Sequence, residues 1–562
     1  MGSFSRRTLL GLGLGASVAA GLSSCATAPS PEPSTPAPQP SPTGPLPAGQ
    51  AWAHLVPHGL PDYLEPGAPP YGETYPLDLI AGDHTAPPRP SSGVPRAQQA
   101  GLTGLHILQL ESAGNSGTDF VIDWMEHADA TWASGSLDGL SIAPCMSPLT
   151  TAGFGRMARE YAAGAVAHRS AARIDGRLVV FVYAARALSL ADWRLAREAL
   201  TRDGVHLYIV GDLQPEASQN AGGLARAEVQ QYARLFDAVW AFDDLALEIS
   251  PQMAALATRE DVPLAGTVMP GYNRETENGG IIDPEGTRRF RASWEAQLAD
   301  RTPWVVGLTW NDAVEHTDIK AGSMWNHTRQ DVNRFYADRL RGRTASGPAN
   351  LYLSSVSHVW PGEPLRAEGL VLNPSDAAVT VTMRLLDANG RPVGSSARAT
   401  VAAHSAGDAT VRVPTSAPRP GPTFLRAAAE LRDASGHLLA QVTGAPILVY
   451  RSPQEAGRDR QDWYSIPAAR SLPRPVRLAV APDRRSATVD SPGTDARFIE
   501  LLQNTRSAGR LIDAAASPFP IPVTRSTIVG PQDVTIPASG FYVGRVISTD
   551  ERVGYSDPIW LG

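Results

Sequence analysis

Cysteine is scarce in this chain of 562 residues, which contains only Cys25 and Cys145. Disulfide bonds therefore do not hold the fold together, and Cys145 is most simply a small core residue. An excess of basic charge is also absent, because 49 lysine and arginine residues are set against 56 aspartate and glutamate residues, giving a net charge of −7. Proteins that bind nucleic acids need a basic surface, so we expect no nucleic-acid partner.

The length predicts several domains. At about 150 residues per domain, a chain of this size holds roughly three to four. Hydrophobic residues make up 43% of the chain, which is enough for ordinary cores. The 51 glycines and 49 prolines exceed the usual share and indicate many turns and a linker.

Residues 1–25 have the pattern of a bacterial export signal. Arg6 and Arg7 precede an apolar stretch that is too short to span a bilayer comfortably. Their Ser-Arg-Arg-x-Leu-Leu context resembles a twin-arginine signal, and the segment ending at Cys25 resembles a lipobox. We predict a lipoprotein held in the cell membrane by a lipid on Cys25 and facing the extracellular side of a bacterium. A plain secretory signal is the alternative.

Residues 26–48 form a proline-rich linker with nine prolines between Pro29 and Pro47. Such a run favours extended polyproline II over helix or sheet, so we interpret it as a spacer.

Residues 49–345 alternate between short apolar runs and helical stretches. The predicted strands are Ala53–Val56, Gly104–Leu110, Leu140–Ala143, Leu178–Tyr183, His206–Val210, Ala238–Phe242, Leu264–Val268 and Trp304–Thr309. The predicted helices include Phe154–His168, Leu190–Leu200, Ala225–Leu235, Pro251–Thr258, Thr287–Ala299 and Gln330–Leu340. Eight strands separated by helices predict an α/β fold, a (β/α)8 TIM barrel. A doubly wound open sheet is the rival, but no Gly-x-Gly-x-x-Gly follows the first strand.

Polar and aromatic residues gather at the ends of these strands, where barrel enzymes place their chemistry. Carboxylates move protons and bind hydroxyl groups, and aromatic rings stack on sugars, so the set suits a polysaccharide. Each acid taken singly is more often a solvated loop residue than a catalyst. The predicted substrate-binding residues are His54, Glu111, Asp212, Trp240, Asp243, Asp244, Tyr272, Asn273, Trp310 and Asn311.

Asp312 and Glu315 follow the eighth strand and are three residues apart. In a loop or a first helical turn, this spacing brings two side chains to one side. Glycoside hydrolysis needs one carboxyl group as acid and another as base or nucleophile. We therefore predict that Asp312 and Glu315 are catalytic, without assigning which is the acid.

Four segments resemble glycoside hydrolase family 71, the alpha-1,3-glucanases or mutanases. Ala53-His54-Leu55-Val56, Pro270-Gly271-Tyr272-Asn273 and the segment from Thr309 to Glu315 are similar to the family's Ala-His-Phe-Met-Val, Pro-Gly-Tyr-Asn and Thr-Trp-Asn-Asp-Tyr-Gly-Glu segments. The stretch from Ala100 to Leu105 is a weaker match.

The resemblance covers residues 51–345 and implies a barrel that hydrolyses an alpha-glucan, most simply alpha-1,3-glucan, in an endo, inverting reaction. It also implies that Asp312 and Glu315 are acid and base. The chain departs from the family after the fourth strand, where Tyr183-Ala184-Ala185-Arg186 replaces a segment with glutamate. It departs again at Cys145-Met146, where the family has Asp-Met. These departures leave open a different linkage specificity and a non-catalytic, glycan-binding lipoprotein on a degenerate barrel.

No cofactor and no metal site are expected. His54, His58, His84 and His316 do not form a helical His-x-x-x-His pattern with a third ligand. We interpret His54 as a hydrogen-bonding partner of sugar hydroxyls.

Beyond about residue 350 the pattern is that of β-structure alone. Residues 379–385 alternate between apolar and polar side chains and precede the turn Asp387-Ala388-Asn389-Gly390. We predict one β-sandwich over 350–450 and a second, resembling a fibronectin type III module, over 455–562. Both are interpreted as spacers or barrel-packing modules. Glycan binding is the alternative, with Trp360, Tyr464 and Trp560 as stacking candidates.

The leading hypothesis is therefore a monomeric, membrane-anchored glycosidase that acts on an alpha-glucan. A non-catalytic glycan-binding protein and a structural envelope protein are the alternatives.

Overall fold

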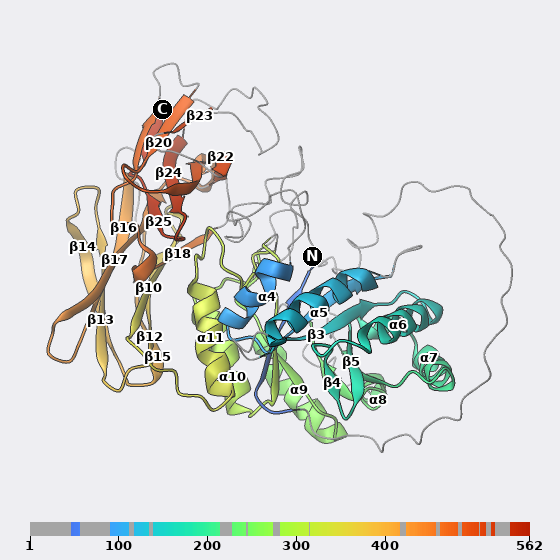
Figure 1. The fold of residues 1–562 in the computed structure, drawn as a ribbon. Coiled ribbons are helices and arrows are strands. Elements are labelled where there is room, and N and C mark those ends of the chain that lie inside the picture. The colour runs from blue at the N-terminus through green and yellow to red at the C-terminus, as the bar shows by residue number, and fades with distance from the viewer. Residues whose placement is uncertain are drawn as a thin grey trace.

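The structure is a computed structural model of the whole chain. It describes residues 47–56, 90–111, 117–133, 139–213, 227–242, 246–273, 281–313, 315–415, 423–456, 461–480, 486–504, 506–512, 519–522 and 540–561. Figure 1 shows an α/β region beside two regions built of strands.

Eight parallel strands form the barrel that the sequence predicts. They are β1 (Gln50–Leu55), β2 (Gly104–Leu110), β3 (Ser141–Ser147), β5 (Arg177–Val182), β6 (Leu207–Asp212), β7 (Ala238–Trp240), β8 (Ala265–Val268) and β9 (Trp304–Gly307). The strands pair in the order β7-β6-β5-β3-β2-β1-β9-β8. A parallel bridge between Val239 and Leu264 brings β7 next to β8 and closes the circle. This confirms the barrel and excludes the open sheet.

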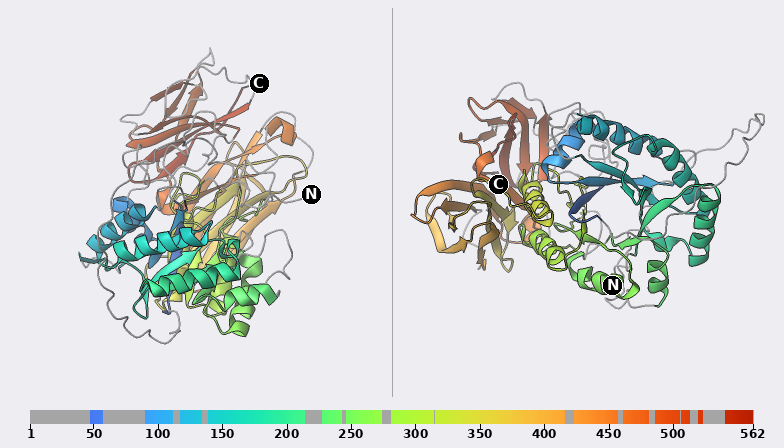
Figure 2. Two further views of the ribbon diagram at one scale, coloured as in Figure 1. Left: turned by 90° about the vertical axis from the view of Figure 1, so that its right-hand side faces the viewer. Right: turned by 60° about the horizontal axis from the view of Figure 1, so that its bottom comes forward.

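A helix follows each barrel strand, and the helices surround the strands (Figure 2). They are α4 (Pro90–Gln99), α5 (Thr118–Ala133), α6 (Thr151–Ala165), α7 (Leu190–Arg202), α8 (Ala227–Ala233), α9 (Ala246–Glu260), α10 (Arg288–Ala299) and α11 (Thr328–Leu340). Among the residues that the structure describes, no helix is both long and apolar enough to cross a membrane.

Helix α7 illustrates how the local sequence sets an element. Ser189 and Asp192 form a reciprocal capping box that satisfies two backbone N–H groups at the start of the helix. Trp193, Ala196 and Leu200 are three to four residues apart and bury one face against the barrel. The helix therefore begins at its cap and is held by its apolar stripe.

The first β-sandwich follows the barrel. One sheet has the order β15-β12-β10-β18 and the other the order β11-β17-β16-β13-β14. The strands are β10 (Asn350–Val356), β11 (His358–Val359), β12 (Leu365–Asn373), β13 (Val379–Leu386), β14 (Pro392–Val401), β15 (Ser405–Val413), β16 (Thr423–Arg432), β17 (Leu438–Val449) and β18 (Trp463–Pro467). Strand β18 lies beyond residue 450, where the sequence places the end of this sandwich, because it returns to pair with β10. That pairing leaves no local signal.

The second sandwich holds the C-terminal strands. Strands β19 (Arg477–Val480), β20 (Ser486–Asp490) and β23 (Phe519–Pro522) form one sheet. The other sheet is formed by β21 (Ala496–Gln503), β22 (Arg506–Ile512), β24 (Gly540–Ser548), β25 (Val553–Tyr555) and β26 (Ile559–Leu561).

Buried charges join the barrel to both sandwiches. Arg291 of α10 donates to Glu368 of β12 at 2.8 Å and to Asp408 of β15 at 2.5 Å. Arg545 of β24 pairs with Glu500 of β21, and both side chains are fully buried. Arg545 also donates to the Ser323 carbonyl oxygen of the barrel at 3.0 Å. The sandwiches are therefore fixed on the side of the barrel that carries α10 and α11 (Figure 2).

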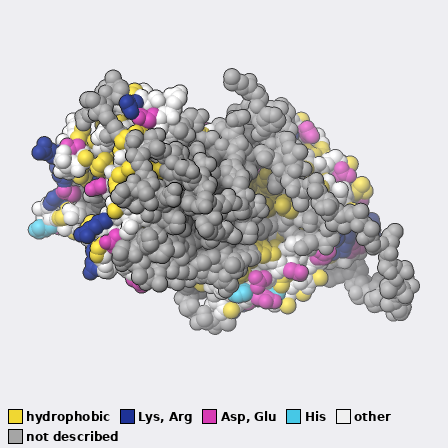
Figure 3. Space-filling view, turned by 90° about the horizontal axis from the view of Figure 1, so that it is seen from above, with side chains coloured by type: hydrophobic (Ala, Val, Ile, Leu, Met, Phe, Trp, Pro, Cys, Tyr) yellow, Lys and Arg dark blue, Asp and Glu magenta, His cyan; other side chains and the backbone are white. Residues whose placement is uncertain are grey.

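Charged side chains of both signs are interspersed on the described part of the face shown in Figure 3.

Candidate functional site

The predicted catalytic pair lies in the loop that leaves β9, at the carboxyl end of the barrel. Asp312 and Glu315 are 7% and 8% exposed. An Asp312 carboxylate oxygen accepts a hydrogen bond from the Glu315 backbone N–H at 3.0 Å. The loop therefore turns within three residues and brings the Asp312 side chain against the Glu315 backbone.

Hydrogen bonds to the ends of neighbouring strands hold this loop. The Asn311 side chain accepts from the Val56 N–H at 2.9 Å and donates to the Val56 carbonyl oxygen at 2.8 Å. The Trp310 N–H donates to the His54 carbonyl oxygen at 2.6 Å, and the Thr309 hydroxyl accepts from the Asp312 N–H at 2.9 Å. Trp310 is 1% exposed and packs in the core. Trp310 and Asn311 thus anchor the loop, and the sugar contact that the sequence predicts for them stays a prediction.

A buried ion pair lies just beyond the acids. Arg329 at the start of α11 donates to the Asp318 carboxylate at 3.2 Å and to the His316 and Asp318 carbonyl oxygens at 2.9 Å each. Burial raises the pKa of the Asp318 carboxyl, the Arg329 guanidinium opposes that rise, and the nearby Asp312 carboxylate adds to it. Asp312 therefore influences the Asp318–Arg329 pair electrostatically.

A cleft of about 130 Å³ opens between the barrel and the first sandwich. The barrel contributes the segments after β8 and β9, and the sandwich contributes aromatic and charged side chains. The lining residues are Gly271, Tyr272, Asn273, Ile281, Asp283, Pro284, His316, Met324, Trp325, Arg329, Trp360, Glu363, Arg366, Gln461, Asp462 and Trp463. Three indole rings beside polar groups are the surface that sugars prefer.

The cleft adjoins the acids but is not lined by them. The Asn273 N–H donates to the Glu315 carbonyl oxygen at 2.9 Å, so the β8 and β9 loops touch at this point. His316, the next residue, lines the cleft. Of the residues that the sequence predicts, the structure brings Tyr272, Asn273 and the stacking candidate Trp360 into the cleft itself.

Polar pairs across the cleft join barrel to sandwich. The Trp463 indole N–H donates to Asp283 at 3.1 Å, and Arg366 pairs with the same carboxylate. The Asn273 side chain donates to Asp462 at 3.1 Å. Sequence reasoning missed Asp283, Asp462 and Trp463, because nothing local marks residues that converge from two domains.

The carboxylates of Glu111 and Asp212 accept hydrogen bonds from backbone N–H groups. The Glu111 carboxylate accepts from the Leu149 N–H at 2.6 Å and from the Thr150 N–H at 3.0 Å, at the start of α6. Asp212 is fully buried and accepts from the Ala184 N–H at 2.9 Å and the Phe242 N–H at 3.0 Å. These contacts tie loops together and give both acids a structural role that the sequence could not show.

The other predicted residues lie inside the barrel or outside the described residues. Trp240 is fully buried, with its ring 5.5 Å from Phe181. His54 is 1% exposed and faces Phe242 at 5.0 Å. Both therefore belong to the barrel interior. Three predicted site residues, Cys25, Asp243 and Asp244, fall outside the described residues, and so do His58 and His84.

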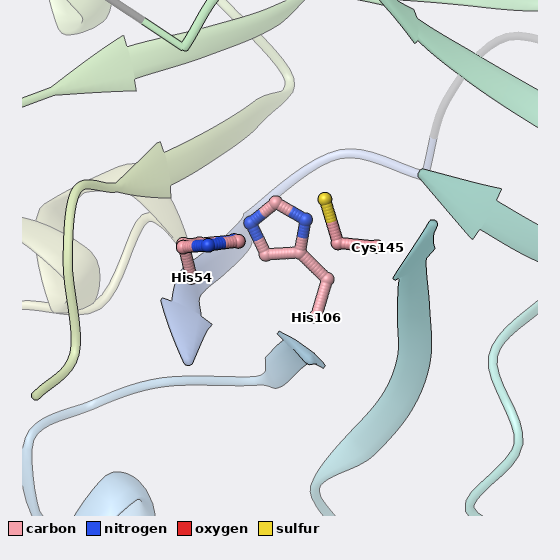
Figure 4. A group of neighbouring side chains, drawn as sticks. All are labelled: His54, His106 and Cys145. Atoms are coloured by element: carbon pink, nitrogen blue, oxygen red, sulfur yellow. The ribbon is translucent and has the colours of Figure 1, made fainter. Parts of the chain in front are cut away.

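A group of nitrogen and sulfur side chains inside the barrel escaped the sequence analysis. His54, His106 and Cys145 come from the adjacent strands β1, β2 and β3 and point toward one another (Figure 4). All three are buried. No motif links them, because strand pairing alone brings them together.

Comparison with known proteins gives matches among solved structures alone: no family model and no curated protein matches the chain. The GH99 endo-alpha-mannosidase from Bacteroides thetaiotaomicron aligns with 53% of this chain and 100% of its own, at 12% identity and a TM-score of 0.41. A Bacteroides uniformis beta-glucuronidase aligns with 91% of this chain and 64% of its own, at 12% identity and a TM-score of 0.36. A beta-D-mannosidase from Dictyoglomus thermophilum aligns with 84% of this chain and 58% of its own, at 9% identity and a TM-score of 0.26. At this level of similarity, function has to be argued from the site itself.

Proposed function

We propose that this protein is a glycoside hydrolase that cleaves an alpha-glucan, with alpha-1,3-glucan as the first substrate to test. The observation that carries the proposal is the Asp312–Glu315 pair in the loop after β9, next to a cleft lined by three tryptophans. Two neighbouring carboxyl groups supply the acid and base of glycoside hydrolysis. The resemblance to glycoside hydrolase family 71 supports the choice of substrate.

The test compares the full chain with single amide variants. Asp312→Asn and Glu315→Gln keep the shape of each side chain and remove its proton chemistry, so turnover of alpha-glucan should fall by orders of magnitude while glycan binding survives. Glu198→Gln is the matched control, because Glu198 lies exposed on α7, on the outer ring of helices. Release of reducing ends is the measurement.

The outcomes separate mechanism from substrate. If neither amide variant loses activity, the acids are not catalytic. If the unaltered chain cleaves a different alpha-linked polymer, the enzyme proposal stands and only the linkage changes.

A non-catalytic glycan-binding protein is the second candidate. It is favoured by the low exposure of Asp312 and Glu315, 7% and 8%, and by their absence from the cleft lining. Asp283 is a carboxylate that does line the cleft, and it is engaged in an ion pair with Arg366, which also favours this candidate. This candidate predicts sugar affinity that Trp360→Ala weakens, without any release of reducing ends.

We also propose that the chain is exported and anchored through a lipid on Cys25. The Arg6-Arg7 context and the small residues before Cys25 support this. Labelling of the host with a radioactive fatty acid should mark the full chain and not the Cys25→Ser variant. Equal labelling of both would rule out this anchor.

A further inference from the structure

Three side chains that can bind a metal meet inside the barrel. His54, His106 and Cys145 each offer one ligand atom, and these atoms all lie within 4.8 Å of one another. The residues belong to three adjacent parallel strands, in which His54 is level with His106 and Cys145 is level with Leu108. Figure 4 shows the His106 ring between the His54 ring and the Cys145 sulfur.

Both nitrogens of the His106 ring are buried without a hydrogen bond to any described residue. The ring is 0% exposed. Phe181 lies 4.2 Å from the ring and Trp240 4.9 Å, so the wall here is aromatic. Burying unpaired polar atoms costs free energy, and each such case in a native fold calls for an explanation. A ligand bound at this point supplies one.

We propose that His54, His106 and Cys145 bind one transition-metal ion of the zinc class. Two imidazoles and a thiolate are the donors of zinc sites, whereas magnesium and calcium take oxygen ligands. The site is independent of the proposed glycosidase activity, because none of the three residues lines the cleft.

Metal binding needs neutral imidazoles and a deprotonated thiol. Burial lowers the pKa of His106, and the neighbouring His54 lowers it further. Burial and the nearby Asp212 carboxylate raise the pKa of the Cys145 thiol. Metal binding therefore has to displace the thiol proton to solvent, and affinity rises with pH. Asp212 then balances part of the positive charge that remains.

Zinc holds its donors closer than the present spacing. With metal–nitrogen distances of about 2.0 Å and metal–sulfur distances of about 2.3 Å, tetrahedral neighbours stand roughly 3.5 Å apart. Donors up to 4.8 Å apart must therefore close by about an ångström, which rotation of the side chains can supply. The bound ion would cross-link β1, β2 and β3. It would also fix the carbonyl group of His54, which receives the Trp310 N–H at 2.6 Å.

The experiment uses the full chain with Cys25→Ser, which leaves Cys145 as its only thiol. The chain is stripped with a chelator and titrated with Zn²⁺, and in parallel with Co²⁺. We expect one equivalent of either ion, a rise in Tm of several degrees with Zn²⁺, and a cobalt–thiolate charge-transfer band in the near ultraviolet. Cys145→Ala and His106→Leu should each remove the band and the Tm shift. His127→Gln, at a half-buried histidine of α5, is the matched control and should change neither.

A second measurement does not depend on how the variants fold. X-ray absorption at the zinc edge of the reloaded chain should show one sulfur neighbour at about 2.3 Å and nitrogen neighbours at about 2.0 Å. A first shell without sulfur, or uptake far below one equivalent by the stripped chain, would overturn the proposal. Retention of the cobalt–thiolate band by a folded Cys145→Ala chain would do so as well.

Discussion

The barrel interior and the joint between barrel and sandwiches use polar groups in opposite ways. At the joint, buried charges satisfy one another: Arg545 meets Glu500, and Arg291 meets Glu368 and Asp408. Inside the barrel, the His106 ring lies against Phe181, and its nitrogens have no hydrogen-bond partner in the part of the chain that the structure describes. The charged groups at the joint hold two domains together, whereas the buried His106 nitrogens call for an explanation.

The largest effect is expected at the joint. Arg545→Ala leaves the Glu500 carboxylate buried without its partner and should cost about 3–5 kcal/mol of unfolding free energy. Replacing both residues, as Arg545→Met with Glu500→Leu, should cost much less, since no charge then remains buried. Arg552→Ala is the control, because its pair with Asp550 is solvent-exposed and worth at most about 1 kcal/mol. Urea unfolding measures all three, and equal losses in the single and double variants would contradict the explanation.

Glu551 should make the joint sensitive to acid. It receives hydrogen bonds from His327 at 2.6 Å and from Arg96, and although burial opposes the shift, these partners lower its pKa to about 2. A carboxyl whose pKa is depressed in the folded state stabilises above its unfolded pKa and loses that contribution as the pH falls toward 2. Glu551→Gln should therefore lower stability by up to about 3 kcal/mol at pH 7, and by progressively less below pH 4.5.

Thermal unfolding of both proteins between pH 7 and pH 3 tests this. The difference in Tm should narrow below about pH 4.5, because the carboxyl then takes up a proton in the unfolded state while the folded protein, with its Glu551 pKa of about 2, still holds it ionised. A difference that stays constant over this range would show that Glu551 acts by packing and not by charge.

A smaller effect is expected at the rim of the cleft. Trp463→Phe removes the indole N–H that donates to Asp283 at 3.1 Å and keeps an aromatic ring in the cleft wall. The loss should be about 1 kcal/mol of unfolding free energy, as for a typical hydrogen bond. If the cleft binds sugar, affinity should fall less in Trp463→Phe than in Trp463→Ala, which isothermal titration with glucan oligosaccharides can measure.

The smallest effect is expected inside the barrel when no metal is bound. His106→Leu replaces unpartnered nitrogens with apolar atoms, so the stripped variant should stay within about 1 kcal/mol of the stripped parent protein or exceed it in stability. Denaturant unfolding of the two stripped chains gives the comparison. A loss of several kcal/mol would mean that the ring has a partner in the folded protein, and the contrast between interior and joint would then disappear.

Local sequence determined most of the barrel. Short apolar runs separated by amphipathic stretches predicted all eight strands, and Gly104–Leu110 coincides with β2. The turn at Gly390, whose φ is +75°, was likewise visible as an Asp-Ala-Asn-Gly segment after the alternating run of residues 379–385. Both predictions succeeded because the spacing of apolar residues and the choice of turn residues lie within the element that they specify or next to it.

The candidate site was predictable only in part. The acids Asp312 and Glu315 could be placed after the last strand, since strand order and a short motif define that position. That Glu111 and Asp212 would serve as acceptors for backbone N–H groups depended on loops that close from elsewhere in the chain.

By itself, the sequence determined a barrel, two β-sandwiches and a pair of acids at a strand exit. Only the tertiary structure decided that Trp463 would face the barrel across a cleft and that His106 and Cys145 would meet His54. The difference lies in the sequence separation over which each kind of interaction acts. Periodicity and caps act over one or two turns of chain, whereas these contacts join residues far apart in sequence that become neighbours only when strands pair and domains pack.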